Sequence, residues 1–430
     1  MQTDNLFIEN IMNKILEPLT YDYSQQKERA EQMSARELYE TIVHNINIMA
    51  SSNDSETSGT TIFATPGCPH KVRDGHYCGC SFCDWSDSNV ADVALIATLR
   101  RKDPNLYKKM QAKSFEVLRG KNVNAKNFEE YAIHDCFDDR EISEEERRYL
   151  FEECPIFSKK PIIGLIQVRA DSVTLQKIEN WKHTVRKQLT VGVGIETGNN
   201  WLRNHWLNKG LNDIAIKNAV KITHEAKCKI SSNLLMIIPG LNDKQNVQVM
   251  IESIRKMHEY EFDFVMLSPL VNKKYTIQNY LNENNFSIEK RQHNLFILYK
   301  MLTELSKLES VILKKLMFSS FNFMEYFDQF DENCNLLCKE IFRSLLSFGA
   351  MKDLSKTIEQ IKNVFEERKL AEEEEKYNLL GGIEDLKKNI KQSGEVLVTT
   401  LFDESDWEYQ LSVLNMELAD WDDLYANVSL

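Results

Sequence analysis

Apolar and polar positions along this chain follow two different periods, and together they predict the order of its elements. Short apolar runs are separated by longer stretches in which apolar residues recur every three or four positions, the spacing of one helix face. The alternation predicts an α/β fold whose parallel sheet is built from βαβ units. The runs that predict strands are 61–65, 131–136, 162–168, 189–196, 230–240 and 262–270. The stretches that predict the connecting helices are 91–118, 143–153, 175–186, 212–226 and 245–260.

The same patterning divides the chain into four regions. Residues 1–60 have helical spacing and end in 51–60, which contains no apolar residue. Residues 61–280 hold the alternation, 281–394 are helical and highly charged, and 395–430 form an acidic tail without Lys or Arg. We expect N-terminal helices, an α/β domain and a mostly helical C-terminal domain. The tail either packs against the chain itself or docks a basic partner.

Composition places the chain among folded proteins and restricts its partners. Hydrophobic residues make up 42% of the 430 positions, with only 8 Pro and 15 Gly, which excludes collagen-like, disordered and disulfide-rich miniprotein classes. The formal net charge of −12 disfavours sequence-independent binding to nucleic acid or anionic lipid. The apolar runs are too short to span a bilayer, and the acid-bearing N-terminus is unlike a signal peptide. We therefore expect a cytoplasmic protein without membrane contact.

Four of the nine cysteines lie close together, directly after the first predicted strand: Cys68, Cys78, Cys80 and Cys83. In a reducing compartment, thiols at this spacing bind zinc or an iron–sulfur cluster. A structural zinc ribbon needs a second CxxC, which does not occur downstream; zinc held by all four local cysteines is the alternative. Three thiolates on a four-iron cluster would leave one iron without a protein ligand, an open position that is typical of catalytic sites.

The Cys80-Ser81-Phe82-Cys83 segment, with its distant first cysteine, resembles the radical S-adenosylmethionine (SAM) superfamily. The long first spacing resembles the Elp3-like branch, and most closely the archaeosine synthase radical SAM subunits. Further similar segments follow in the family's strand order: AIHDCFDDREISEEERR, IQVRADSVT, VGIETGNNWLRNHWLNKG, LLMIIPGLND and LSPLVNKKYT. The resemblance covers about residues 61–276 and implies a partial parallel (βα)6 radical SAM barrel.

The chain also departs from those relatives. Residues 238–240 (Ile-Pro-Gly) end the fifth strand differently, and residues 135–138 stand where the family has Gly-Gly-Glu. The C-terminal third does not resemble the archaeosine enzymes. Elp3 itself carries an acetyltransferase domain, but this sequence has no glycine-rich acetyl-CoA loop. The substrate therefore does not follow from the resemblance.

The resemblance implies a cofactor set and a reaction class. Cys68, Cys80 and Cys83 would hold a [4Fe–4S] cluster whose remaining iron binds S-adenosylmethionine, with a flavodoxin or ferredoxin as reductant. The reaction implied is reductive cleavage of SAM followed by hydrogen abstraction from a small-molecule or peptide substrate, in which the cofactor performs the difficult step. Cys78 lies too close to Cys80 for the same cubane, so we interpret it as a bystander.

Five further residues are candidates for the site. Glu196, at the end of the fourth predicted strand, is expected to accept hydrogen bonds from the SAM ribose. Arg169, Arg203 and Lys209 could neutralise the SAM carboxylate, with solvation at the surface as the alternative. Cys136, at the end of the second strand, is either a catalytic thiol that returns a hydrogen atom to the substrate or an inert buried cysteine.

Two other functions compete with this interpretation. A tRNA nucleoside-modifying radical SAM enzyme is suggested by the relatives, but the acidic charge and the absence of a known RNA-binding module disfavour it. A non-catalytic zinc-stabilised scaffold would bind zinc and no SAM. Cys334 and Cys338 share one helix face, which predicts either core packing or an auxiliary metal site.

Overall fold

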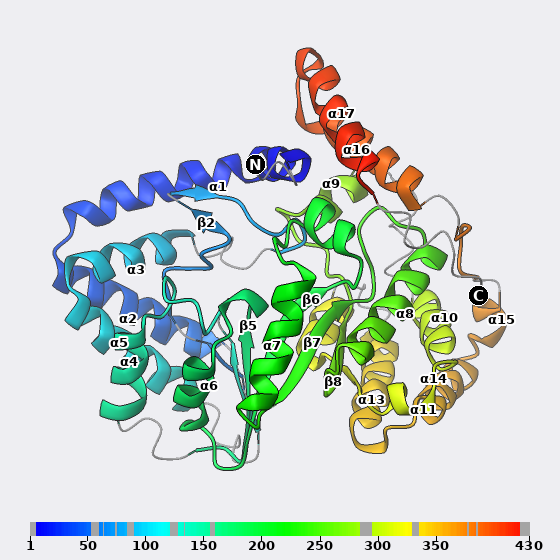
Figure 1. Cartoon of the computed structure of the whole chain (residues 1–430), viewed down its shortest axis with the longest axis horizontal. Helices are drawn as coiled ribbons and strands as arrows, with labels where there is room; N and C mark the ends of the chain where they lie inside the picture. The colour runs from blue at the N-terminus through cyan, green and yellow to red at the C-terminus, as the bar shows by residue number, and fades with distance from the viewer. Residues whose placement is uncertain are drawn as a thin grey trace.

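The computed structural model describes residues 6–52, 60–62, 64–73, 75–83, 90–120, 128–132, 134–154, 160–283, 295–328, 335–375, 378–383 and 386–421. A parallel sheet lies at the centre of the molecule (Figure 1). Its strands are β1 (Thr60–Ile62), β4 (Phe128–Ala132), β5 (Ile163–Val168), β6 (Gln188–Glu196), β7 (Lys229–Leu235), β8 (Phe264–Ser268) and β9 (Leu316–Phe318).

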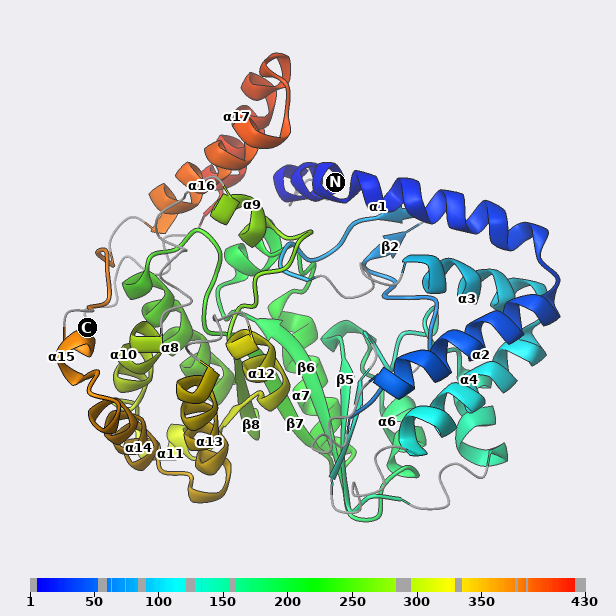
Figure 2. The same cartoon turned by 180° about the vertical axis from the view of Figure 1, so that it is seen from behind.

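The strands follow one another across the sheet in chain order. Because parallel crossovers are right-handed, connections that always step in the same direction place their helices on one face, and the twisted sheet curls into an open half-barrel. Helix α7 (Asp213–Glu225) lies in front of the sheet in Figure 1 and behind it in Figure 2. The expected α/β fold with a partial parallel barrel is confirmed. The sheet also carries β9, whose three-residue apolar run is too short to show a period in the sequence.

The helices between the strands lie close to their predicted positions. The predicted helix 91–118 is two helices, because Pro104 lacks the amide hydrogen needed to continue a helix and starts a new one. Side-chain caps begin α7 at Asn212 and α8 at Asn242. The remaining bounds are α3 (Val90–Lys102), α4 (Pro104–Gly120), α5 (Glu144–Arg148) with a π-helical turn (Tyr149–Glu153), α6 (Leu175–Lys182), α8 (Asp243–Glu259), α9 (Ile277–Glu283), α10 (Leu295–Leu305) and α11 (Ser310–Leu313).

The two faces of the sheet differ in polarity. Toward the helices the strands present mostly buried apolar side chains, together with the buried Glu129 and Ser232. The ring of Tyr131 in β4 lies 5.5 Å from that of Trp181 in α6. The opposite, concave face carries partly buried polar side chains: Glu130, Gln167 and Asn233. The apolar face forms the core, and the polar side chains of the concave face are suited to a polar ligand.

Two N-terminal helices, α1 (Leu6–Gln32) and α2 (Ala35–Ser52), precede the sheet as predicted. Helix α1 runs along the upper left of the molecule in Figure 1. Helix α2 packs against α4, beside which it lies in Figure 2, and a small separate core forms there around Leu38 and Tyr107.

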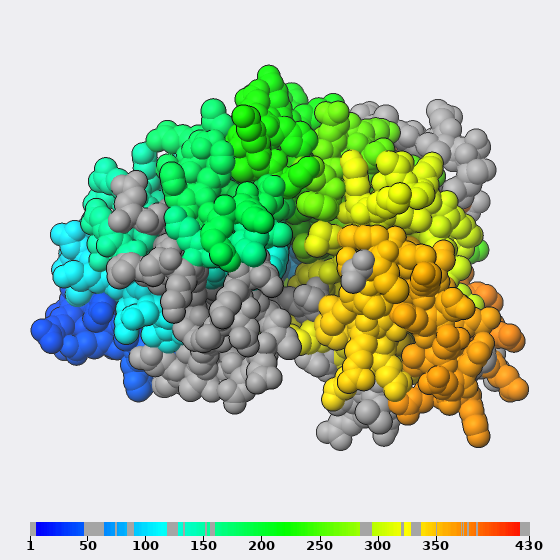
Figure 3. Space-filling view, turned by 90° about the horizontal axis from the view of Figure 1, so that it is seen from below, coloured from blue at the N-terminus to red at the C-terminus, as the bar shows by residue number. Residues whose placement is uncertain are grey.

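After β9 the chain is helical: α12 (Ser320–Asp328), α13 (Asn335–Met351), α14 (Leu354–Glu367), α15 (Ala371–Glu374), α16 (Leu386–Leu401) and α17 (Glu404–Ala419). Seen from below, the yellow and orange C-terminal helices lie on the side opposite the blue and cyan N-terminal ones (Figure 3). Cys338 is buried in the core, whereas Cys334 lies outside the described residues. No helix in the described part of the chain is both long and apolar enough to cross a bilayer.

The described part of the acidic tail packs against the rest of the chain. Glu417 of α17 is buried and accepts hydrogen bonds from the Phe7 amide (2.7 Å) and from Nδ1 of His205 (2.8 Å). The ring of Trp421 stacks on Trp201 with centroids 4.3 Å apart. Of the two alternatives for residues 395–421, the structure therefore shows packing on the chain itself.

Candidate metal and cofactor site

The cysteine loop follows β1 and folds back on itself through a short antiparallel hairpin. The hairpin pairs β2 (Val72–Arg73) with β3 (His76–Tyr77) and separates Cys68 from the other cysteines. Gly79 adopts a φ of +100°, and a Cβ there would lie 2.9 Å from the carbonyl oxygen of His70. Glycine therefore lets the returning arm pass close to the outgoing one.

Two of the other cysteines, Cys80 and Cys83, act electrostatically on Cys68. Burial, then Glu141, then the thiols of Cys80 and Cys83 raise the pKa of Cys68. The three sulfurs therefore lie in one neighbourhood at the carboxyl edge of the sheet. No three Cys, His, Asp or Glu side chains of the described residues are already arranged around a single metal ion. A four-iron cluster spreads its thiolates more widely, since each binds a different iron, so this donor set is compatible with such a cluster.

The loop is fastened to the segment that follows β6. Ser81 donates through its amide to the Leu207 carbonyl (3.1 Å) and through its hydroxyl to the Trp206 carbonyl (2.8 Å). Asn208 donates to the Gly79 carbonyl at 2.8 Å. These anchoring residues were not among the predicted site residues, although they lie in the segments that carry the family resemblance. They position the cysteines relative to the end of β6.

Nε2 of His70 donates to the Asn208 carbonyl at 2.8 Å, which assigns the proton to this nitrogen. Burial and the nearby Arg169 lower the pKa of His70 well below its usual value. The ring is therefore neutral, and its Nδ1 accepts a hydrogen bond from Arg73 at 3.0 Å.

Glu196 and Lys209 form a nearly buried ion pair at the end of β6. Nζ of Lys209 lies 2.8 Å from Oε1 of Glu196, and the two side chains are 11% and 10% exposed. Burial opposes the charged ammonium, but Glu196 and Cys80 outweigh it and raise the pKa of Lys209. Gly194 makes the arrangement possible, because a Cβ there would lie 2.7 Å from Lys209 Nζ. The structure thus brings two predicted residues together beside the cysteines.

Arg169, directly after β5, joins the same neighbourhood. Its Nη2 donates to the carbonyls of Lys209 (2.9 Å) and Gly210 (3.2 Å). Burial opposes its charge, but Asp171 and Cys80 raise its pKa. Two cations, Arg169 and Lys209, therefore stand where they can balance the negative charge of thiolates.

Arg203 is fully buried, and its guanidinium donates its hydrogen bonds to residues of the segment after β6. It donates to the carbonyls of Leu211 (2.7 Å) and Thr197 (3.1 Å) and pairs with Asp213 (2.6 Å). The structure therefore gives it partners that brace the segment after β6, not partners among the cysteines.

Cys136 is fully buried, and its thiol donates to the Tyr131 carbonyl at 3.7 Å. Nearby, Glu141 is a fully buried carboxylate that accepts from Thr65 (2.7 Å) and from Nδ1 of His134 (2.6 Å). Sequence reasoning did not select Glu141, although it lies in the segment that resembles the family after its second strand. It braces the chain just before Cys68.

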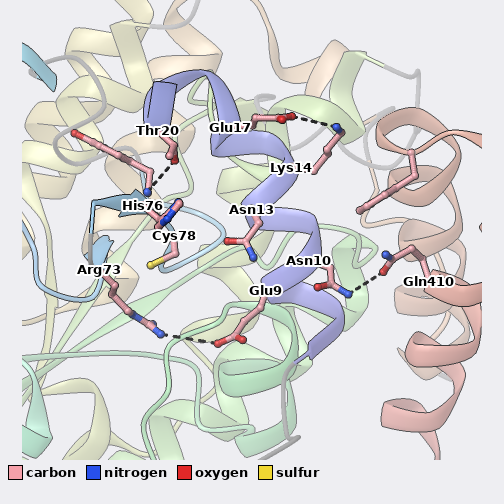
Figure 4. A pocket seen from close by; sticks show the side chains of 12 residues that line it. Glu9, Asn10, Asn13, Lys14, Glu17, Thr20, Arg73, His76, Cys78 and Gln410 are labelled. Carbon is pink, nitrogen blue, oxygen red and sulfur yellow. Dashed lines mark hydrogen bonds and ion pairs between the residues drawn. The ribbon is translucent and has the colours of Figure 1, made fainter. Parts of the chain in front are cut away.

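Cys78 faces a different space. A cavity of about 710 Å³ is lined by Cys78 and Arg73 of the cysteine loop, by Glu9 of α1 and by Gln410 of α17 (Figure 4). Burial raises the pKa of Cys78, and the charged groups with the largest effects on it are Arg73, Glu9 and Lys71. Cys78 is thus turned away from the three clustered thiols.

Comparison with known proteins yields distant likenesses. No protein-family model matches the chain. An uncharacterized protein of Methanocaldococcus jannaschii is 22% identical over 249 residues, which cover 58% of this chain and 64% of that relative.

Two solved structures are similar at low level. Methylornithine synthase aligns with a TM-score of 0.35 and 11% identity over 72% of this chain and 78% of its own. The radical S-adenosylmethionine methyltransferase TsrM of Kitasatospora setae, solved with cobalamin and a [4Fe–4S] cluster, aligns with a TM-score of 0.36 and 9% identity over 71% of this chain and 61% of its own.

Proposed function

We propose that this protein is a radical SAM enzyme in which Cys68, Cys80 and Cys83 bind a [4Fe–4S] cluster. The observation that carries the proposal is the convergence of these thiols at the carboxyl edge of a parallel half-barrel, with Cys78 turned away. Ligands of parallel sheets bind at that edge. A set of three sulfurs suits a cluster with one open iron better than it suits a closed zinc site.

The residues around the thiols fit SAM by charge. Lys209 and Arg169 are cations suited to the carboxylate of SAM, and Glu196 is an acceptor suited to its ribose hydroxyls or its ammonium. When bound, cluster and SAM together would supply a one-electron cleavage that protein side chains cannot perform. The chain's own part is to hold the cofactors, to keep water from them and to orient the substrate.

Two predicted residues take other roles in this proposal. Arg203 is a positioning residue, because its hydrogen bonds hold the segment that carries Lys209. Cys136 lies in the turn that follows β4, which ends at Ala132, and not at the end of the strand as predicted. Its complete burial and its hydrogen bond to the Tyr131 carbonyl support the packing role. We further propose a flavodoxin or ferredoxin as reductant and a small molecule or peptide as substrate. The formal charge of −12 disfavours tRNA.

Metal analysis of paired cysteine variants tests the cluster. Protein reconstituted anaerobically with iron and sulfide should hold about four irons per chain, and with dithionite and SAM it should release 5′-deoxyadenosine. Cys83→Ala should lose the iron, whereas the matched Cys78→Ala should keep it. If the purified protein holds stoichiometric zinc and both variants lose it equally, the protein is a zinc-stabilised scaffold and the proposed function is wrong.

The SAM pocket is tested by removing one cation. Lys209→Met should weaken SAM binding by about tenfold or more, because it leaves the ligand carboxylate and Glu196 without their cation. Equilibrium dialysis of SAM against reconstituted protein measures the effect. The control is Lys14→Met, which changes an exposed lysine on α1; equal affinities in the two variants would refute the assignment.

A further inference from the structure

A row of hydrogen-bonded polar side chains crosses the concave face of the sheet. Nε2 of Gln167 in β5 donates to Oε1 of Glu130 in β4 at 2.7 Å. Nδ2 of Asn233 in β7 donates to Oε1 of Gln167 at 2.9 Å. All three residues are only partly buried, whereas Ile166, which faces the helices, is fully buried. The row therefore lies on the concave face, opposite the helices, where Leu165 and Ser231 are buried beside it.

Two glycines of β6 allow the row to form and connect it with the cofactor site. A Cβ at Gly192 would lie 2.9 Å from Oε1 of Gln167, so only glycine lets this carboxamide cross β6 and reach β7. A Cβ at Gly194 would lie 2.7 Å from Nζ of Lys209. Residues two apart in a strand share a face. The row and the Glu196–Lys209 pair thus lie over the same face of β6.

The carboxylate at one end determines the orientation of both amides. As a carboxylate, Glu130 only accepts hydrogen bonds, so Gln167 must offer it the amide nitrogen and turn its oxygen toward Asn233. Asn233 must then offer Gln167 its nitrogen, which leaves its own Oδ1 as the free end of the row. Each hydrogen bond polarises the next, so this oxygen is a strengthened acceptor.

That acceptor has no hydrogen-bond partner within the described part of the chain. Oδ1 of Asn233 is enclosed and unpaired, and so is Oγ of Ser231, two residues earlier on the same face. In the sheet register Ser231 lies beside Gly192 and Asn233 beside Gly194, positions that carry no side chain. Buried polar atoms are normally paired, and glycine inside a strand often marks the close approach of a ligand. Oδ1 of Asn233 can only accept, so it indicates a ligand that donates a hydrogen bond, whereas the Ser231 hydroxyl can donate or accept.

We propose that this row is a substrate subsite that selects a hydrogen-bond donor, such as the N–H of an amide or an amine. A carboxylate or phosphate would set an acceptor against Oδ1 of Asn233, and a hydrocarbon would leave that oxygen unpaired. That the ligand is a substrate rests on the proposed function, whereas the preference for a hydrogen-bond donor rests on the row alone.

Binding of three matched probes tests the preference. Propionamide, propylamine and propionate share a three-carbon skeleton and differ in the polar group. The full-length chain, purified in air without added iron, is examined with each probe by saturation-transfer NMR. Propionamide or propylamine should bind, and Gln167→Leu should weaken that binding at least about threefold. Gln176→Leu, which alters an exposed glutamine of α6, should leave it unchanged.

A second variant keeps the test decisive if Gln167→Leu does not fold. Asn233→Asp has the same shape but loses the amide that donates to Gln167 and presents a carboxylate instead. It should therefore strengthen binding of propylamine, which is a cation at neutral pH, about fivefold over propionamide. Binding of propionate equal to that of the donors, or donor binding that neither variant changes, would overturn the proposal. The probes are tested on cluster-free protein, so a failure to bind iron would refute the proposed function and leave this result intact.

Discussion

Asp135 allows a quantitative test of the electrostatics behind the cysteine loop. Its side chain is fully buried, and burial raises its pKa to about 7. Oδ1 accepts hydrogen bonds from the Phe137 amide and the Ser172 hydroxyl, both at 2.9 Å, while Oδ2 has no partner among the described residues. Asp135→Asn keeps the shape and the accepting oxygen but removes the ionisable group.

The expected gain follows from the difference between the folded and unfolded pKa values. An unfolded aspartate titrates near pH 3.9, so a folded pKa of about 7 is a difference of about 3 units, or about 4 kcal/mol at roughly 1.4 kcal/mol per unit. Below about pH 4 Asp135 is protonated in both the folded and the unfolded chain, so it does not lower the free energy of unfolding. As the pH rises from about 4 toward 7, the unfolded chain ionises more readily than the folded one, and the free energy of unfolding falls. Asp135→Asn should therefore be up to about 4 kcal/mol more stable than wild type near pH 8 and equal to it near pH 4.

Urea unfolding at several pH values measures this difference. Asp138→Asn is the matched control of opposite sign, because burial opposes ionisation there but the hydrogen bonds from Arg140 lower the pKa of Asp138. The control should lose stability at neutral pH and approach wild type in acid. If Asp135→Asn is no more stable than wild type near pH 8, the buried carboxylate of Asp135 does not lower the free energy of unfolding, and the reasoning is wrong.

Two further substitutions probe how the site is held. Gly79→Ala should lower the free energy of unfolding by about 1–3 kcal/mol and reduce the iron bound on reconstitution, because the positive φ and the contact with His70 both exclude a Cβ. The control is Gly349→Ala on α13, where nothing lies near the added Cβ. It should leave the free energy of unfolding unchanged or raise it by up to about 1 kcal/mol. Glu417→Ala should lower the free energy of unfolding in urea by about 3 kcal/mol, because Phe7 and His205 lose a buried partner. The control is Glu408→Ala on the exposed face of α17. Equal stability of the two variants would show that Glu417 does not anchor the tail.

The periodicity of apolar residues was sufficient to predict the fold class and most of the elements. Six of the seven strands of the parallel sheet and the helices that connect them follow from it, although the second predicted strand, 131–136, shares only residues 131–132 with β4. The exceptions have physical causes. Strand β9 is too short to show a period, and the break at Pro104 depends on a single missing amide hydrogen rather than on the apolar pattern.

Cysteine spacing likewise predicted where to look for the site but not how it is arranged. Spacing alone separated Cys78 from the other three, and the structure shows it facing a separate cavity. The sequence makes Arg203 and Lys209 equally good candidates for the SAM carboxylate. In the structure Arg203 pairs with Asp213 and braces a loop, whereas Lys209 pairs with Glu196 beside the cysteines. Local sequence does not contain that difference, because it depends on which carbonyls and carboxylates the folded loop places around each side chain.

The sequence by itself determined the order of strands and helices, the reduced thiol cluster and the edge of the sheet at which it lies, because these depend on local period and on chain direction. Only the tertiary structure decided which charges meet. Glu141 behind Cys68, the pair of Lys209 with Glu196, and the row from Glu130 to Asn233 join residues from different strands and loops. Their contacts exist because the sheet curls, and because glycines 192 and 194 leave room for side chains that belong to other segments.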